Sequence, residues 1–226
     1  MNKQIADQLQ KTLHIPLEQI VRENYEMIVL KRLFESQLGS LFVFKGGTAL
    51  RLAHGCPRFS EDLDFSLTGD FDKKACDQVL KSIEHEYDNL TIKELVQNKN
   101  TYFALFQIKE SFLAQNFSIK FEASTRIGDI SWKKGEDFDL TVLSSRVTPL
   151  TVLAQVATLE RIKKDKLSIN PKRVRDIFDL WFIDQKLGGN SSINFQGFDP
   201  KVVKREMHKF LPKNERAMLK SWLPQE

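Results

Sequence analysis

The chain has 226 residues, of which 41% are hydrophobic and 10% aromatic, which is enough apolar material for a buried core in one or two modest domains. Its formal net charge of +4 is mildly basic and excludes the strongly cationic class of chromatin proteins. No run of 18 or more apolar residues occurs, and residues 1–4 lack the basic-then-apolar layout of a signal peptide, so we expect a cytoplasmic protein without membrane spans.

The first elements are organised around a pair of glycines. Apolar residues recur at a helical period over residues 17–38, which predicts an amphipathic helix. Residues 41–44 form a short apolar run that stops at Gly46-Gly47, a pattern typical of a buried strand ending in a tight turn. Residues 48–54 contain good helix formers and end at Gly55, so the turn should open a short helix.

The rest of the chain alternates between strands and helices before becoming helical. A polar loop leads into a predicted strand over residues 63–67, and residues 70–98 are expected to be helical. Further strands are predicted at 102–108 and 117–122, which should pair as an antiparallel hairpin, and at 141–143. From Pro149 onward we expect helices at 150–167, 175–187 and 201–222. The sequence therefore predicts an α+β fold, with a mixed α/β part over residues 1–148 and a helical part over residues 149–226.

Two aspartates are candidates for a metal site. Asp62 and Asp64 lie two residues apart at the start of a predicted strand, so both carboxylates should project from the same face. Hard carboxylate oxygens, with phosphates completing the coordination, are the ligands that Mg²⁺ prefers. Such pairs are common in proteins, and two exposed loop acids are the alternative interpretation.

The Gly46-Gly47 turn is a candidate phosphate site. Free backbone N–H groups at the start of a helix attract anions, and glycines let a phosphate approach closely. Thr48 adds a hydroxyl beside the turn. A glycine pair alone is often only a turn, but one placed a short helix before a carboxylate pair favours a site for a nucleotide and its metal ion.

Three blocks of sequence carry a resemblance to a known family. Residues 44–52 (FKGGTALRL), 58–65 (RFSEDLDF) and 173–181 (RVRDIFDLW) resemble the motifs of the AbiEii/AbiGii nucleotidyltransferase toxin family. That family is related by fold to DNA polymerase β, so the resemblance implies a small mixed sheet flanked by helices, with a helical C-terminal part.

The resemblance also implies roles for residues within these blocks. Lys45, Gly46, Gly47, Thr48 and Ser60 would bind the nucleotide. Asp62 and Asp64 would be catalytic metal ligands.

A catalytic lysine that contacts the triphosphate is implied on the helix before the third block. Lys166 is our first choice, with Lys163, Lys164 or a merely solvated lysine as alternatives.

Two further acidic residues are candidates for the site. Asp176 would be catalytic, as an orienting residue or base, but an acid that stabilises a helix N-terminus is the alternative. Relatives of polymerase β usually have a third metal-binding carboxylate on a neighbouring strand. Glu122 is the candidate here, and a surface glutamate is its alternative.

The implied activity is transfer of a nucleoside monophosphate from a nucleoside triphosphate to the 3′ end of tRNA, with Mg²⁺ or Mn²⁺. The resemblance further implies a toxin with a cognate antitoxin encoded nearby. Basic stretches at 161–166, 171–175 and 201–205 fit an RNA partner, although solvated helix faces would have the same composition. Two alternatives stay open: a protein or small-molecule acceptor, and a non-catalytic nucleic-acid-binding module.

Overall fold

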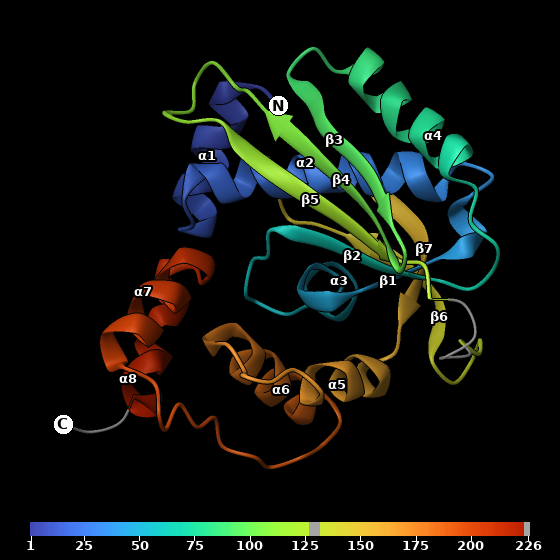
Figure 1. Ribbon diagram of the computed structural model, residues 1–226. Helices are drawn as coiled ribbons and strands as arrows, with labels where there is room; N and C mark the ends of the chain where they lie inside the picture. The colour runs from blue at the N-terminus through green and yellow to red at the C-terminus, as the bar shows by residue number, and fades with distance from the viewer. Residues whose placement is uncertain (127–131, 224–226) are drawn as a thin grey trace.

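The computed structural model describes residues 1–126 and 132–223, and this part of the chain forms one mixed sheet of seven strands with helices on both faces (Figure 1). The strands are β1 (Phe42–Lys45), β2 (Asp62–Leu67), β3 (Leu90–Asn98), β4 (Thr101–Ile108), β5 (Phe117–Ser124), β6 (Phe138–Ser144) and β7 (Thr151–Ala157). The α-helices are α1 (Lys3–Leu13), α2 (Leu17–Phe34), α3 (Gly46–His54), α4 (Lys73–Glu86), α5 (Leu159–Leu167), α6 (Val174–Lys186), α7 (Pro200–Phe210) and α8 (Leu219–Trp222). The predicted α+β fold class, a mixed sheet flanked by helices, is confirmed.

The centre of the sheet is the unit β1–α3–β2. β1 and β2 are antiparallel neighbours, and each has a parallel neighbour on its other side, β7 beside β1 and β5 beside β2. Antiparallel pairs extend the sheet to both edges in the order β3-β4-β5-β2-β1-β7-β6. No helix among the described residues is long and apolar enough to cross a bilayer.

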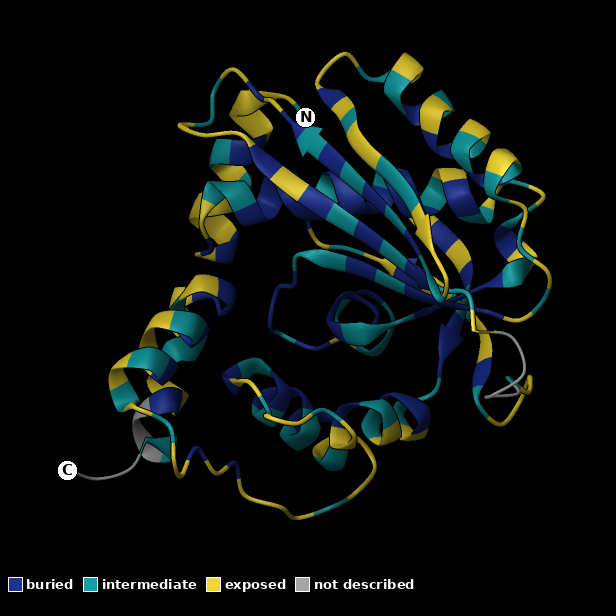
Figure 2. Ribbon diagram, in the orientation of Figure 1, coloured by how far each residue is buried: buried dark blue, intermediate teal, exposed yellow. Residues whose placement is uncertain are grey.

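Helices α2 and α4 cover one face of the sheet, and this interface is a large part of the hydrophobic core, which also includes residues of α3, α5, α6 and α7 (Figure 1). Aromatic rings from adjacent strands pack together there, with ring centroids 4.5 Å apart for Phe65 and Phe121 and 5.3 Å apart for Phe44 and Phe65. Each such fully buried ring contributes about 1.5–3 kcal/mol to stability. Figure 2 shows the buried residues alternating with less buried ones along the strands, so the second face of the sheet is free to carry polar residues.

The elements predicted around the glycine pair are confirmed. The helix expected over 17–38 is α2, which ends at Phe34, and the strand expected over 41–44 is β1. The following helix begins at Gly46 and ends before Gly55, whose φ of 75° is the left-handed conformation that favours glycine at a helix end. The predicted hairpin forms between β4 and β5, and the short strand expected at 141–143 is part of β6.

The helix predicted over residues 70–98 is wrong in its second half. Helix α4 ends at Glu86, and residues 90–98 form the strand β3, which pairs with β4. The pairing register shifts between Ile92 and Glu94. Because this irregularity interrupts the strict alternation of a strand, the apolar residues of β3 lack the period-two pattern by which a strand is identified.

The helix predicted over residues 150–167 is also wrong in its first half, because residues 151–157 form β7 in the interior of the sheet. Val152, Ala154 and Val156 are buried and alternate with outward residues, but one of the outward residues is Leu153, which is 60% exposed. An exposed leucine between buried apolar residues hides the alternation. The sheet therefore continues past residue 148, and the change to helices comes at Thr158, whose hydroxyl caps α5.

The C-terminal helices differ from the prediction in one place. Helix α6 matches the helix expected over 175–187, but the single helix expected over 201–222 is interrupted. Helix α7 ends at Phe210, and Pro212 follows, which cannot continue a helix because it lacks a backbone N–H. A 3-10 turn (Lys213–Met218) and the short α8 complete this segment.

Candidate active site

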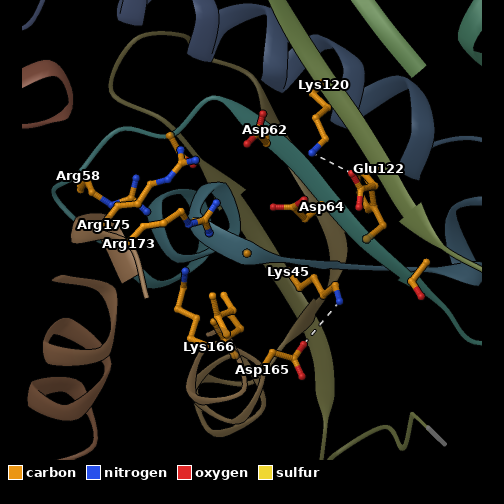
Figure 3. Close-up of a pocket in the computed structure, with 17 residues that line it drawn as sticks. Lys45, Arg58, Asp62, Asp64, Lys120, Glu122, Asp165, Lys166, Arg173 and Arg175 are labelled. Atoms are coloured by element: carbon orange, nitrogen blue, oxygen red, sulfur yellow. Dashed lines mark ion pairs between the residues drawn. The ribbon is translucent and has the colours of Figure 1, made fainter. Parts of the chain in front are cut away.

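A pocket of about 260 Å³ lies on the face of the sheet opposite α2 and α4, where α5 and the start of α6 approach the central strands (Figure 3). Its lining includes the glycine turn and the aspartate pair, together with cationic and acidic side chains. Among the described residues, the cationic side chains that line it are Lys45, Arg58, Lys120, Lys166, Arg173 and Arg175. The acidic side chains that line it are Asp62, Asp64, Glu122 and Asp165.

The glycine turn forms one wall of the pocket, and the structure requires glycine at both positions. Gly46 has φ of +81°, and a Cβ there would lie 2.4 Å from an Asp64 carboxylate oxygen. A Cβ at Gly47 would lie 2.6 Å from the Arg58 guanidinium and 2.7 Å from the Ser60 hydroxyl. No described side chain caps α3, so the N–H groups of its first turn remain available to an anion in the pocket.

Thr48 and Ser60 take different positions beside this turn. The hydroxyl of Ser60 faces the pocket. Thr48 is buried and its hydroxyl donates a hydrogen bond of 2.5 Å to the backbone carbonyl of Asp62. Thr48 therefore ties the glycine turn to the strand that carries the two aspartates, and its hydroxyl is already engaged.

The carboxylates come from two parallel strands. Asp64 lies opposite Lys45 of β1 and opposite Glu122 of β5, and Asp62 lies opposite Lys120. Since directly paired residues point to the same face of a sheet, all five side chains share the pocket face. Sequence reasoning predicted the shared face of Asp62 and Asp64; the pairing with β5 adds Lys120 and Glu122, and the pairing with β1 adds Lys45.

Asp62 and Asp64 fit a divalent cation. Burial, and after it the charge of Asp62, raise the pKa of Asp64 to about 6, because burial disfavours the charged form and a second negative charge on the same strand face disfavours it further. A bound cation would offset both effects. The chemistry of the pair, hard oxygens with room for phosphate ligands, suits Mg²⁺ or Mn²⁺. Glu122 forms an ion pair of 2.8 Å with Lys120, and no three acidic, histidine or cysteine side chains among residues 1–126 and 132–223 converge as a ready-made metal cluster.

A buried ion network supports the cationic side of the pocket. Asp179 is fully buried and binds Arg58 through two hydrogen bonds of 2.9 and 2.8 Å. The ammonium of Lys166 lies 2.7 Å from Asp179 and 3.2 Å from Asp176. Arg173 makes the third connection, at 2.8 Å from Asp176. The two aspartates thus hold three pocket cations in place.

Asp176 lies behind the pocket and does not line it. It is fully buried at the start of α6, where its carboxylate also accepts a hydrogen bond from the backbone N–H of Arg173. Burial alone would raise the pKa of Asp176, but the hydrogen bonds from Arg173 and the charge of Lys166 hold it well below its usual value. A carboxylate that binds protons so weakly fits the orienting role better than the role of a base.

The three candidate lysines of α5 are separated by their positions. Lys166 is buried and lines the pocket. Lys163 points to α6, where it forms an ion pair of 3.0 Å with Asp184, and Lys164 is exposed.

Sequence reasoning missed several residues of the pocket. Arg58 and Arg173 lie within the sequence blocks that carry the resemblance, and Lys120 shares a strand face with Glu122, so weak signals for them existed. Arg175 lies in the same block as Arg173 and had the same weak signal, whereas Asp165 gave no signal, because the sequence does not show which helix faces turn toward the sheet.

A family model described as "Nucleotidyl transferase AbiEii toxin, Type IV TA system" matches residues 28–220 of the chain. No curated protein matches.

Several solved structures are similar to the chain in fold. JHP933 from Helicobacter pylori is 23% identical, with a TM-score of 0.54 over 76% of this chain and 68% of that one. A putative nucleotidyltransferase from H. pylori is 24% identical, with a TM-score of 0.52 over 74% of this chain and 69% of that one. MenT4, a nucleotidyltransferase toxin from Mycobacterium tuberculosis, is 16% identical, with a TM-score of 0.58 over 91% of this chain and 68% of that one. At these identities the likeness shows a shared fold.

Proposed function

Because the chain belongs to the AbiEii family of nucleotidyl transferase toxins of type IV toxin–antitoxin systems, we propose that it transfers a nucleoside monophosphate from a nucleoside triphosphate to the 3′ end of tRNA in the cytoplasm. Membership of the family makes a nucleoside triphosphate its substrate and an antitoxin its partner. The divalent metal ion, the RNA acceptor and the roles of single residues are the proposed parts.

One observation carries the proposal: the Asp64 carboxylate lies against Gly46 at the uncapped start of α3, and Asp62 lines the same pocket. Nucleotidyl transfer needs charge neutralisation at the α-phosphate and a firm hold on the phosphates that leave. The aspartate pair supplies the first and the glycine turn supplies the second. Placing both within one pocket supports in-line attack on the α-phosphate.

The position of each residue in the pocket suggests whether it would bind the metal ion or the phosphates. Asp62 and Asp64 would hold Mg²⁺ or Mn²⁺, with Glu122 as a third ligand once it leaves Lys120. The bound ion would polarise the phosphoryl oxygen and stabilise the entering and leaving oxygens. The N–H groups of Gly46 and Gly47 would receive the β and γ phosphates.

Cationic side chains would complete the triphosphate site. Lys166, with Arg58 and Arg173 beside it, would neutralise the pyrophosphate as it leaves. Lys45 would contact the nucleotide on the side of Asp165, and the Ser60 hydroxyl would contact it beside Gly47 and Arg58. Asp176 would orient Lys166 and Arg173.

The acceptor is a hydroxyl whose oxygen forms the new bond to the α-phosphate as the bond to pyrophosphate breaks. A tRNA 3′ end is supported by the basic side chains around the pocket entrance and on α7, where Lys201, Lys204 and Arg205 are exposed. Phosphate contacts of this kind weaken with salt and carry little base specificity. A protein or small-molecule acceptor is the rival outcome.

The test is labelling of purified total tRNA with each radioactive triphosphate in turn, in Mg²⁺ and in EDTA. The wild-type protein should label RNA only with the metal ion present, and Asp64→Asn should lower the rate at least about 100-fold, as expected for loss of a catalytic metal ligand. Absence of RNA labelling with all four triphosphates would refute the RNA acceptor. Label in added protein but not in RNA would instead identify a protein acceptor.

A further inference from the structure

The pocket has two chemically different ends (Figure 3). Arg58, Lys166, Arg173 and Arg175 gather at one end, and the Arg58 guanidinium lies against Gly47 of the phosphate turn. Asp165 lies apart from the three arginines of this group and beside Lys45, with which it forms an ion pair. A triphosphate carries its negative charge at one end, so it should lie among the four cations with its α-phosphate at the aspartates, and the nucleoside should then extend toward Asp165.

Asp165 is the only acidic residue that α5 contributes to the lining, within the described part of the chain. It lies three residues after Ile162, a spacing that places the two side chains on one helix face, and Ile169 follows just after the helix end. Ile162 is buried, so the half-buried Ile169 provides the apolar surface for the flat face of a base, and the carboxylate is a polar group beside that surface. An apolar wall with one well-placed polar group is how small-molecule sites achieve specificity.

The carboxylate of Asp165 is held in a defined orientation. One of its oxygens pairs with the Nε of Arg161 at 3.4 Å, and the other lies 3.6 Å from the ammonium of Lys45. Arg161 is itself fixed, because it is buried, bound to Asp137 at 2.9 Å and stacked 4.1 Å from the Trp132 ring. The oxygen on the Lys45 side therefore faces the pocket, and only a flexible lysine competes for it.

A carboxylate in ion pairs accepts hydrogen bonds and donates none. The exocyclic amino groups of cytosine and adenine are donors, and the ring nitrogen beside each amino group can accept from Lys45. Uracil and hypoxanthine present a carbonyl oxygen in place of the amino group. These bases do carry a ring N–H, but it lies beside the carbonyl oxygen, and the negative carboxylate repels that oxygen.

We propose that Asp165 selects the nucleobase of the incoming triphosphate, favouring cytosine and adenine, whose amino group is at ring position 4 or 6, over bases that carry an oxo group at that position. The proposal rests on the nucleotide orientation of the proposed function. It assigns to Asp165 a contact with the base, separate from the metal ligands and the phosphate-binding residues.

The test compares dissociation constants for two matched pairs of triphosphates, CTP against UTP and ATP against ITP, by calorimetry with Mg²⁺ and without an acceptor. Each pair differs at the amino position and in the ring proton that accompanies it. In the wild-type protein the amino member should bind about 10- to 100-fold more tightly, the range expected for one hydrogen bond to a charged group. In Asp165→Asn both ratios should fall to about one, because an amide can donate to the carbonyl oxygen.

Comparing two ligands in the same variant removes any general loss of folding or affinity from the ratio. Glu160→Gln is the matched control, because Glu160 is an exposed acid on α5 that does not line the pocket, and its ratios should equal those of the wild type. Asp165→Ala should also lose the discrimination.

Binding with wild-type ratios near one, or ratios that persist in Asp165→Asn, would overturn this proposal and leave the nucleotide site intact. Failure of all four triphosphates to bind would overturn it together with the nucleotide site. Selective binding without nucleotide transfer would support it and refute only the activity.

Discussion

Replacing Asp179 should destabilise the protein more than the loss of an ordinary ion pair, because this carboxylate balances two buried cations. Its side chain is 0% exposed, and that of its partner Arg58 is 1% exposed. In Asp179→Leu, Lys166 keeps its ion pair with Asp176, but Arg58 keeps only its hydrogen bond to the Phe59 carbonyl. A buried charge left without its partner costs about 3–5 kcal/mol.

This cost is large beside the whole stability of a typical domain, which is about 5–15 kcal/mol. Urea denaturation of the wild type and Asp179→Leu measures it directly, and the melting temperature should fall by roughly 6–20 °C, from about 2–4 °C per kcal/mol for a chain of this size.

The matched control is the double variant Arg58→Met/Asp179→Leu. Replacing both partners of a buried ion pair by apolar residues of similar volume is often neutral or stabilising. The double variant should therefore regain most of the stability that the single variant loses, while nucleotide binding stays weak because Arg58 is missing from the pocket. A loss below about 1 kcal/mol in Asp179→Leu, the size seen for exposed pairs, or a double variant no more stable than the single one, would refute the reasoning.

Three further substitutions test the walls of the pocket. Gly46→Ala should cost about 1–2 kcal/mol of unfolding free energy through its positive φ, and it should lower transfer about 100-fold by displacing the Asp64 carboxylate, the proposed metal ligand; near-normal transfer would contradict this. Lys166→Gln should weaken triphosphate binding about tenfold or more, whereas Lys163→Gln should change the dissociation constant less than twofold. Equal effects would contradict the choice of Lys166 as the lysine that contacts the triphosphate. Thr48→Val should lower the unfolding free energy by about 1–2 kcal/mol, through loss of the hydrogen bond to the Asp62 carbonyl, and leave the triphosphate affinity unchanged. Thr48→Ser should retain both the stability and the affinity. A large loss of affinity in Thr48→Val would instead indicate a direct phosphate contact.

Local patterns in the sequence determine the centre of this protein. The strand before Gly46, the helix that ends at Gly55 and the strand that begins at Asp62 all follow from apolar runs and turn residues, and the structure has each of them. The shared face of Asp62 and Asp64 also follows, since side chains in a strand alternate. The period of apolar residues and the turn preferences of glycine and proline depend only on residues close together in the chain, so a single sequence is enough to recognise them.

Two strands could not be predicted because their local pattern is distorted. A register shift interrupts β3, and Leu153 occupies an outward position in β7. Both segments become strands because a neighbouring strand completes their hydrogen bonds, β4 for the first and β6 for the second. Tertiary pairing overrides a weak local preference in such cases.

The chemistry of the pocket likewise has a local part and a tertiary part. The sequence by itself determined the glycine turn, the aspartate pair and their order along the chain. Only the tertiary structure decided that Arg58 meets Asp179 across 121 residues, that Lys166 rather than Lys163 faces the site, and that Thr48 is turned toward the Asp62 backbone. These contacts depend on how α5 and α6 dock against the sheet, and docking is set by the packing of whole faces, which no short stretch of sequence contains.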